Sequence, residues 1–320
     1  MDIRKGLQGL RILITGANGF LGRHVVRQLS SWGIPCTATS LQKHSTSSHA
    51  IVKWISMDLR NAEEVRSVVR LSQPRIVVHL AAAVSSGRTP IDVENTMGVN
   101  VLGTHNLLRS LMDEAPELVR VVVLGTGEEY GNSDRLPLTE EHPLQPVSPY
   151  SASKAAANQF VFLYQKLFSL PCVILRPFVI YGPDQAPTMM IPELITSALS
   201  GKEFRMTKGE QTRDFVYVDD VIDCLWRAAM IDAAAGNIFN VCTGREHTLR
   251  EVAERVLALT QSSSQLLLGA LPYRQNEVWR SYGSYEKARR VLHWEPATDL
   301  DTGLRKTIEW YQHMRLVAAS

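Results

Sequence analysis

The chain has 320 residues and a formal net charge of +2, and 45% of its residues are hydrophobic. This length allows a large buried core, and the near-neutral charge gives no indication of a nucleic acid or an acidic membrane as partner. No apolar run reaches the roughly 20 residues that span a bilayer, and the polar opening segment lacks the apolar stretch of a signal peptide. We therefore expect a cytoplasmic protein without a membrane segment.

The cysteines and histidines give no sign of a disulfide or a metal site. The nine histidines show no ligand spacing, and His79, at the end of an apolar run, is expected to be a packed core residue. The cysteines are far apart, form no C-x-x-C pair and stand among apolar neighbours, so we expect buried, reduced thiols and no metal. They are Cys36, Cys172, Cys224 and Cys242.

Apolar strand-like runs alternate with helical patterns through the first half of the chain. This alternation predicts an α/β fold with a Rossmann-type doubly wound parallel sheet, covered by helices on both faces. The expected strands are 11–16, 35–40, 52–58, 75–81, 120–126 and 172–177. The expected helices are 20–32, 62–71, 99–112 and the one that contains Tyr150.

Three glycines follow the first expected strand and open the first helix, with the spacing G-x-x-G-x-x-G. Glycines allow a tight turn there and let a pyrophosphate approach the helix N-terminus, where free N–H groups favour negative charge. The motif therefore predicts a dinucleotide site, with a plain tight turn as the alternative. The expected contacts are Gly16, Asn18, Gly19, Phe20, Leu21 and Gly22.

The second expected strand ends where a dinucleotide enzyme meets the adenosine ribose. An acid at this point selects the 2′-hydroxyl, whereas a basic or small polar group permits a 2′-phosphate. The segment 37–45 contains no acid, and Ser40, Lys43 and His44 could accept a phosphate. The segment favours NADP over NAD, although loop lysines are usually only solvated.

Polar residues follow the strand expected at 120–126. Thr126 stands at its carboxyl end, where ligand-binding residues of doubly wound folds collect. Its hydroxyl could bond a substrate oxygen and relay a proton to Tyr150. Glu128 and Glu129 come next, and we expect Glu129 in particular to be a solvated loop carboxylate.

Tyr150 and Lys154 lie four residues apart, on one face of the expected helix. A free phenol, with a pKa near 10, is a poor acid–base catalyst at neutral pH. A nearby ammonium, together with a nicotinamidium ring, would lower that pKa. The small side chains of residues 151–153 and 155–157 would let a flat cofactor approach closely. The alternative is a surface tyrosine beside a solvated lysine.

After Pro177 the alternation breaks, and proline and glycine become frequent. We expect a second, smaller α/β region that covers the carboxyl ends of the strands and binds substrate. The predicted division assigns 1–176 plus 214–242 to a dinucleotide-binding domain and 177–213 plus 243–320 to a C-terminal substrate-binding domain.

The glycine loop, Thr126 and the Tyr150–Lys154 pair together resemble the extended short-chain dehydrogenases/reductases, and within them the nucleotide-sugar epimerase/dehydratase group. The resemblance covers nearly the whole chain. Further matching segments are 79–82, 100–104, 176–183, 213–221, 240–244 and 271–277.

The resemblance implies a role for each matching residue. Tyr150 is implied as the acid/base at the sugar oxygen, Lys154 as the ligand of the nicotinamide ribose, and Thr126 as a hydrogen-bond partner of the reacting oxygen. The implied cofactor contacts are Asp58 and Leu59 at the adenine, Leu80, Ala81, Ala82 and Asn100 along the dinucleotide, and Pro177 against the nicotinamide.

For the substrate, a nucleoside-diphosphate sugar, the resemblance implies that Arg213 and Arg274 hold the diphosphate and that Glu277 lies near the nucleoside ribose. Arginine suits this task because its guanidinium binds phosphate bidentately. An ion pair of Arg213 with Asp214 or Asp219 is the structural alternative. A homodimer, paired through the helix at 99–112 and the Tyr150 helix, is also implied.

The chain departs from the group at two places. Val179 stands where many relatives have asparagine, and Gly127 precedes Glu128 where 4,6-dehydratases often have Asp-Glu. The segment 125–131 also resembles GDP-4-keto-6-deoxymannose reductases. We therefore expect hydride transfer at sugar C4 by an epimerase or 4-keto reductase. A 4,6-dehydratase that uses Glu128 is the alternative, and a non-catalytic cofactor-sensing module is a further one.

Overall fold

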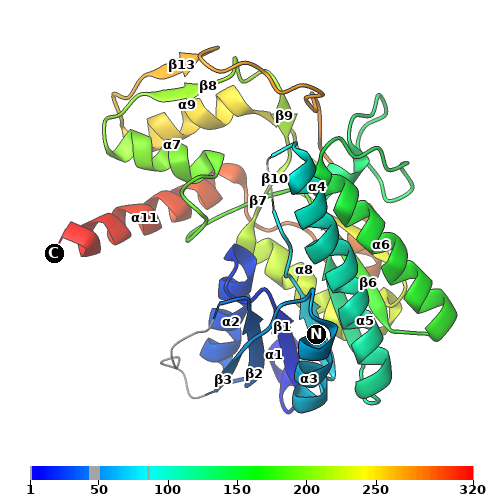
Figure 1. The fold of residues 1–320 in the computed structure, drawn as a ribbon. Coiled ribbons are helices and arrows are strands. Elements are labelled where there is room, and N and C mark those ends of the chain that lie inside the picture. The colour runs from blue at the N-terminus through cyan, green and yellow to red at the C-terminus, as the bar shows by residue number, and fades with distance from the viewer. Residues whose placement is uncertain (1, 43–50, 85–86, 320) are drawn as a thin grey trace.

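The computed structural model describes residues 2–42, 51–84 and 87–319 (Figure 1). Its centre is a seven-stranded parallel sheet in the order β11-β6-β5-β4-β1-β2-β3, which confirms the doubly wound fold. The strands are β1 (Ile12–Thr15), β2 (Cys36–Ser40), β3 (Val52–Ser56), β4 (Ile76–His79), β5 (Arg120–Leu124), β6 (Cys172–Pro177) and β11 (Ile238–Val241).

Both faces of this sheet are buried, as the continuous apolar runs of its strands require. Successive side chains of a strand point to opposite faces. Ile12 and Ile14 accordingly join the core under α2 (Phe20–Trp32) and α8 (Val218–Met230). Leu13 joins the core on the other face. That second core lies under α3 (Ala62–Ser72), α5 (Gly103–Glu114) and α6 (Pro149–Phe168).

Three helical segments run in succession beside α6: α4 (Pro90–Thr96), the π-helix η1 (Met97–Leu102) and α5 (Figure 1). The sequence predicted one helix over 99–112, so the wider π-helical turn is a finding of the structure. Such turns often mark functional positions in helices. Here the π-helical turn contains Asn100.

The smaller region lies at one end of the sheet, at the top of Figure 1. It contains three strand pairs, which are β7 (Val179–Tyr181) with β10 (Phe215–Tyr217), β8 (Phe204–Met206) with β13 (Leu266–Leu268), and β9 (Thr212–Arg213) with β12 (His247–Thr248). Its helices are α7 (Met190–Leu199), α9 (Leu249–Thr260) and α11 (Leu300–Ala319). One hydrophobic core connects it with the sheet, because Trp226, Tyr217 and Leu194 belong to the same buried cluster as Ile14.

The remaining elements are short: α1 (Ile3–Leu7), η2 (Gly127–Tyr130), η3 (Asp232–Ala234) and α10 (Glu286–Leu292). The four cysteines are free and buried, as predicted. Among the described helices, none combines the length and the apolarity that crossing a bilayer requires.

Candidate functional site

The glycine loop between β1 and α2 has the close packing that its glycines permit. Gly16 has a φ of +67°, and a Cβ there would lie 2.6 Å from the Cα of Ala81. A Cβ on Gly22 would lie 2.3 Å from the Gly16 carbonyl oxygen. Gly19 is the N-cap of α2 and offers no side-chain bond to the first-turn amides. These amides therefore face outward over a loop that an anion can approach.

Arg23 holds this loop against the smaller region, a link that the sequence analysis missed. Its Nη1 donates to the Asn18 carbonyl at 2.7 Å, and its Nε donates to Asp184 Oδ2 at 2.7 Å. Asp184 lies in the segment that follows β7. The pair fixes the glycine loop relative to the segment that opens the smaller region.

The residues expected around the adenosine are mostly engaged inside the protein. Ser40 is buried, and its hydroxyl donates to the Gln42 carbonyl at 2.7 Å. Asp58 accepts from Arg60 Nη2 at 2.7 Å, and this hydrogen bond lowers the pKa of its carboxyl. Leu59 packs against Gly103 on α5, where even a Cβ would lie only 2.7 Å away. Lys43 and His44 lie outside the described residues.

Leu80, Ala81 and Ala82 follow β4 at the same sheet edge as the glycine loop. Asn100 supports this segment, because its Oδ1 accepts from the Ala83 amide at 2.7 Å. Its Nδ2 donates to the Ala83 carbonyl at 3.1 Å and to Ser153 Oγ at 2.8 Å. Asn100 thus fastens the segment to α6, and these internal bonds use its amide.

Lys154 is an unusual buried lysine. It is 5% exposed, and within the described part of the chain its ammonium has no ion pair or hydrogen bond. Burial lowers its pKa to about 8, while Glu129 acts in the opposite direction. A buried cation without a direct ion-pair or hydrogen-bond partner is costly, and such groups cluster at ligand sites.

Tyr150, one turn before Lys154, is partly buried. Burial raises the pKa of its phenol, and the nearby carboxylates of Glu128 and Glu129 raise it further. In the protein alone the pKa of Tyr150 is therefore raised, whereas the sequence predicted a lowering by Lys154 together with a nicotinamidium ring. The small residues around this pair also serve helix packing, since Ser153 and Ala157 are buried and Ser153 bonds to Asn100 on η1.

Thr126 is the N-cap of η2 and is 8% exposed. Its hydroxyl accepts from the Glu128 amide at 3.2 Å. Its own amide donates to Glu129 Oε1 at 2.9 Å, and Asn158 Nδ2 donates to the same oxygen at 2.7 Å. Asn158 lies one turn after Lys154, so Glu129 ties the strand end to the Tyr150 face of α6.

The expectation that Glu129 is solvated is wrong, because this carboxylate is fully buried. Its Oε2 accepts from Arg176 Nε at 2.9 Å, and the Arg176 side chain is itself 2% exposed. The sequence analysis missed Arg176. Its signal was a charged residue in an otherwise apolar strand, which requires a buried partner.

Glu128, in contrast, points into an open region. Its side chain is exposed to solvent, yet surrounding protein atoms raise the pKa of its carboxyl. Arg213, Arg274 and Arg88 act in the opposite direction. Three guanidinium groups are therefore near enough to Glu128 to favour its charged form.

Arg213 pairs with Glu277 at 2.7 Å and donates to the Val278 carbonyl at 2.6 Å. The alternative pairing with Asp214 or Asp219 is wrong. Asp214 is buried, and its carboxylate accepts from the Thr243 amide at 2.8 Å and from Gly244 and Gly283.

Arg88 is a further cation that the sequence analysis missed. Its guanidinium donates to the Gln275 carbonyl, which connects the segment after β4 with the segment that carries Arg274. Thr89 holds it in place by capping α4, with its amide 2.9 Å from Asp92 Oδ2. A lone arginine in a short loop carries little signal, because its partner is distant in sequence.

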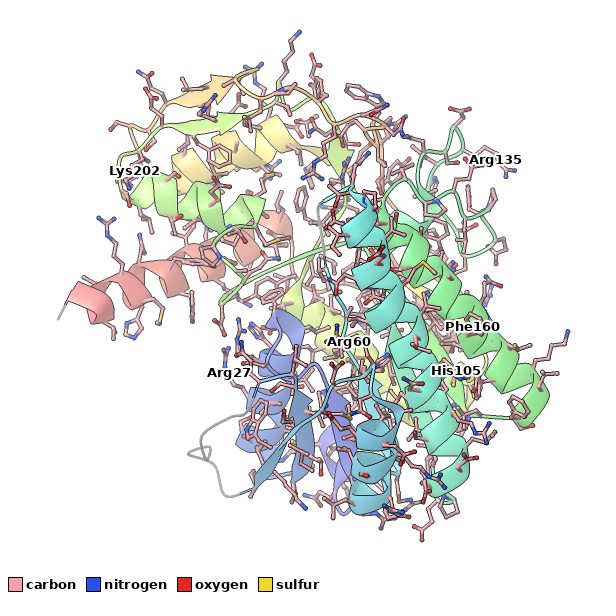
Figure 2. The ribbon with its side chains drawn as sticks, in the orientation of Figure 1. Arg27, Arg60, His105, Arg135, Phe160 and Lys202 are labelled. Carbon is pink, nitrogen blue, oxygen red and sulfur yellow. The ribbon has the colours of Figure 1, made fainter. Side chains whose placement is uncertain are left out.

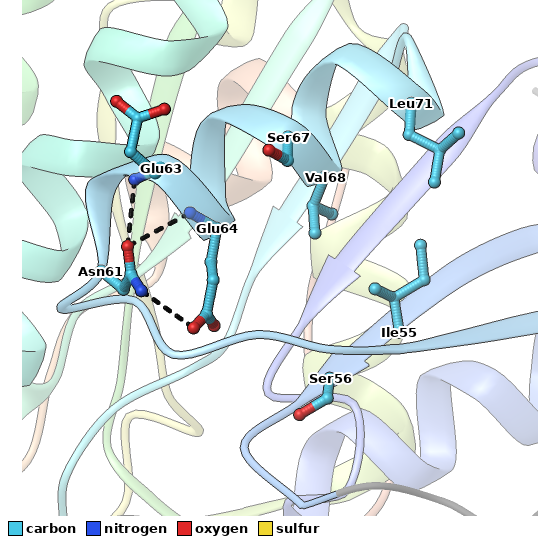
Figure 3. Close-up of a pocket in the computed structure, with 8 residues that line it drawn as sticks. All are labelled: Ile55, Ser56, Asn61, Glu63, Glu64, Ser67, Val68 and Leu71. Atoms are coloured by element: carbon cyan, nitrogen blue, oxygen red, sulfur yellow. Dashed lines mark hydrogen bonds between the residues drawn. The ribbon is translucent and has the colours of Figure 1, made fainter.

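Pro177 ends β6 opposite Val241 of β11, and Val179 begins β7 two residues later. A hollow of about 380 Å³ opens elsewhere, between β3 and α3 (Figure 3). It is lined by Ile55, Ser56, Asn61, Glu63, Glu64, Ser67, Val68 and Leu71. None of these is among the residues above, so the hollow is separate from the candidate site.

Residues 13–307 match the family described as GDP-mannose 4,6-dehydratase. A UDP-glucose 4-epimerase from Mycolicibacterium smegmatis is 31% identical, over 95% of this chain and 99% of the relative.

Two solved structures extend the likeness to the fold. A UDP-glucose 4-epimerase from Thermotoga maritima, solved with UDP-glucose, is 26% identical with a TM-score of 0.87, over 96% of this chain and 100% of that one. A dTDP-glucose 4,6-dehydratase from Streptomyces venezuelae, solved with NAD, is 27% identical with a TM-score of 0.86, over 96% and 98% of the two chains.

Proposed function

Because the chain belongs to the GDP-mannose 4,6-dehydratase family of NAD(P)-dependent nucleotide-sugar enzymes, we propose that it transfers hydride at C4 of a nucleoside-diphosphate hexose. Tyr150 is the acid/base of this reaction, which is either a 4-epimerisation or the reduction of a 4-ketone. The observation that carries the proposal is the buried, unpaired Lys154 one turn from Tyr150.

The residues present fit a nicotinamide dinucleotide. Gly16 and Gly22 leave no space for a Cβ, so the loop packs tightly beneath the uncapped N-terminus of α2. Lys154 offers an ammonium that a ribose hydroxyl can satisfy. When bound, the cofactor supplies or accepts hydride. The two-part division at 1–176 plus 214–242 would place this cradle in one domain and the sugar subsite at its border with the other.

Tyr150 is suited to donate a proton. With its pKa raised by burial, the phenol stays protonated at neutral pH and can give its proton to a C4 oxygen as that oxygen becomes an alkoxide. Thr126 accepts a bond from the Glu128 amide, which leaves its hydroxyl proton for the same oxygen. The Arg213–Glu277 pair and Arg274 would hold the diphosphate and ribose.

NADP is the preferred cofactor in our proposal, because Ser40 stands at the end of β2 where NAD enzymes place an acid. Ser40→Asp should repel a 2′-phosphate and weaken NADPH binding by about tenfold to a hundredfold, with little effect on NADH. Fluorescence titration of both cofactors measures the ratio. An unchanged ratio would remove the NADP preference.

A 4,6-dehydratase is the second candidate, and Glu128 is the observation that favours it. The raised pKa of its exposed carboxyl suits a group that exchanges a proton with the sugar. Glu128→Gln should then abolish loss of water from the sugar, whereas epimerisation or ketone reduction should persist in this variant.

The test is a panel of UDP-, GDP-, dTDP- and CDP-hexoses and their 4-keto derivatives, each with NADPH or NADH. Mass spectrometry separates the reactions, because an epimer keeps its mass, a reduced ketone gains two hydrogens and a dehydrated sugar loses one water. Ketone reduction also consumes NADPH stoichiometrically. If the protein binds cofactor but converts no sugar, the cofactor-sensing module replaces this proposal.

We also propose a homodimer formed through α5 and α6. Both helices carry exposed apolar side chains, among them Met112 (36%) on α5 and Phe160 (40%) and Leu167 (61%) on α6. Figure 2 labels Phe160 on α6 and His105 on neighbouring α5. Leu167→Glu should yield a monomer by light scattering if this face is the interface, whereas the exposed residue Leu316 on α11 is the control position for the same change.

A further inference from the structure

His79 ends β4 and is 1% exposed, yet no step of the proposed reaction uses it. Both of its ring nitrogens have partners. Nδ1 lies 2.7 Å from the Thr15 hydroxyl, directly before the glycine loop, and Nε2 lies 3.0 Å from the Thr104 hydroxyl on α5. The histidine therefore connects the strand that carries the glycine loop with the helix that follows η1.

The directions of these bonds follow from the outer partners. Thr104 Oγ1 lies 2.6 Å from the Asn100 carbonyl oxygen, which can only accept, so the threonine proton points there. Thr104 must then accept from His79, and the proton is on Nε2. Thr15 Oγ1 accepts from the Ala81 amide at 3.3 Å and is left to donate to Nδ1. The bonds run in one direction through a neutral ring.

The network continues to the acid/base residue. The backbone carbonyl of Asn100 accepts from the Thr104 hydroxyl, and the side-chain Nδ2 of Asn100 donates to Ser153 Oγ at 2.8 Å. Ser153 Oγ donates in turn to the Tyr150 carbonyl at 2.7 Å. The bonded path thus begins at Ala81, beside Gly16, and ends at the backbone of Tyr150.

We propose that His79, in its Nε2–H tautomer, is a positioning residue that sets the distance between the dinucleotide cradle and the Tyr150 helix. Its role in cofactor binding and turnover rests on the proposed function, whereas its tautomer does not. A ring is suited to this place because it is rigid and presents one donor and one acceptor on opposite sides. An apolar residue of equal size would leave the Thr15 donor without its acceptor and the Thr104 acceptor without its donor.

The surroundings keep the ring neutral. Burial lowers the pKa of His79 to about 3, and the Lys154 ammonium acts in the same direction. A doubly protonated ring would also leave the Thr15 hydroxyl without its acceptor. The bond directions should therefore persist in mildly acidic solution.

The first test is the tautomer itself. Long-range proton–nitrogen correlation NMR on protein labelled at its histidines reports which ring nitrogen carries the proton. The signal that disappears in His79→Gln belongs to His79. We expect the neutral Nε2–H pattern, unchanged down to about pH 5. A proton on Nδ1, or a charged ring at that pH, would overturn the proposal whether or not the enzyme turns over any sugar.

The second test separates positioning from stability. His79→Leu should weaken NADPH binding and lower kcat, each by about tenfold to a hundredfold, because a small displacement of reacting groups has a large effect on rate. His79→Gln should recover much of both losses, since its side-chain amide can donate to Thr104. Val78→Ala, a buried neighbour in the same strand, is the matched control for loss of stability.

If Val78→Ala and His79→Leu lower both stability and NADPH affinity equally, His79 is only a packed core residue and the proposal fails. If His79→Leu alone affects NADPH affinity, the proposal stands even where no substrate has been found. Should the wild-type protein bind neither NADPH nor NADH, the proposed function fails, and the tautomer still tests the network separately.

Discussion

Two regions next to Tyr150 are built in opposite ways. One is the buried network of Thr126, Glu129 and Arg176, and the other is the arginine-lined region of Arg88, Arg213 and Arg274. In the buried network, the side chains of Glu129 and Arg176 are 0% and 2% exposed, and they pair with each other. In the arginine-lined region, the Arg213 side chain is 21% exposed, while Arg88 and Arg274 are open to solvent. This difference is what the proposed function requires, namely a preorganised acid/base centre combined with substrate-binding side chains that can still adapt to a ligand.

The largest effect is expected at Tyr150, next to the buried network. Tyr150→Phe should lower kcat by about a thousandfold, because the phenol proton has no substitute. NADPH affinity should change little, since the hydroxyl has no bond that holds the described structure together. Steady-state kinetics and fluorescence titration measure the two quantities. Turnover at the wild-type rate in this variant would remove the proposed mechanism.

Changes in the arginine-lined region should affect binding more than rate. Arg274→Met should raise KM for the nucleotide sugar by about tenfold to a hundredfold. It should leave kcat and thermal stability nearly unchanged, because the Arg274 side chain is exposed and has no hydrogen bond or ion pair within the described part of the chain. Arg135→Met, in an exposed loop, is the control. A fall in kcat with constant KM would assign Arg274 to the acid/base centre instead.

The fold was predictable because it depends on local patterns. Apolar runs at 75–81 and 120–126 that alternate with helical patterns are typical of buried parallel strands, and the glycine motif is typical of a turn between a strand and a helix. The spacing of Tyr150 and Lys154 placed both on one helix face. These inferences need no knowledge of distant contacts.

The missed features all depend on partners that are far apart in the chain. Glu129 is buried because Arg176 lies 47 residues further on, and Arg213 pairs with Glu277 across 64 residues. The pKa of Tyr150 depends on how closely Glu128 and Glu129 approach it. Strand register and packing in three dimensions decide which distant residues pair. The spacing of residues along the chain does not predict these pairs.

Lys154 should destabilise the cofactor-free protein, because a buried group that serves a ligand lowers the free energy of unfolding when the ligand is absent. Its pKa, lowered from 10.5 to about 8 by burial, means that the folded protein disfavours its charge at neutral pH. Lys154→Met should therefore raise the free energy of unfolding by about 1–3 kcal/mol in cofactor-free protein. The same change should abolish the thermal stabilisation by NADPH.

Urea denaturation with and without NADPH measures both effects. Lys166→Met, near the exposed end of the same helix, is the matched control and should change neither quantity. A destabilised Lys154→Met variant would show that the ammonium has an internal partner, contrary to the arrangement described here.

His79 should make the stability of the folded protein depend on pH. Its pKa is lowered from 6.5 to about 3, so between these values the unfolded chain binds a proton that the folded protein does not. The free energy of unfolding should therefore fall as the pH drops through this range, by at most about 1.4 kcal/mol per pH unit from this group. His79→Gln removes that contribution, so the free energy of unfolding of this variant should fall less steeply as the pH drops. Urea denaturation at several pH values measures the slope, with exposed His313→Gln as the control. Equal slopes for wild type and His79→Gln would mean that the His79 ring also takes up a proton in the folded state. The surroundings of His79 would then be less isolated from solvent than its hydrogen bonds to Thr15 and Thr104 indicate.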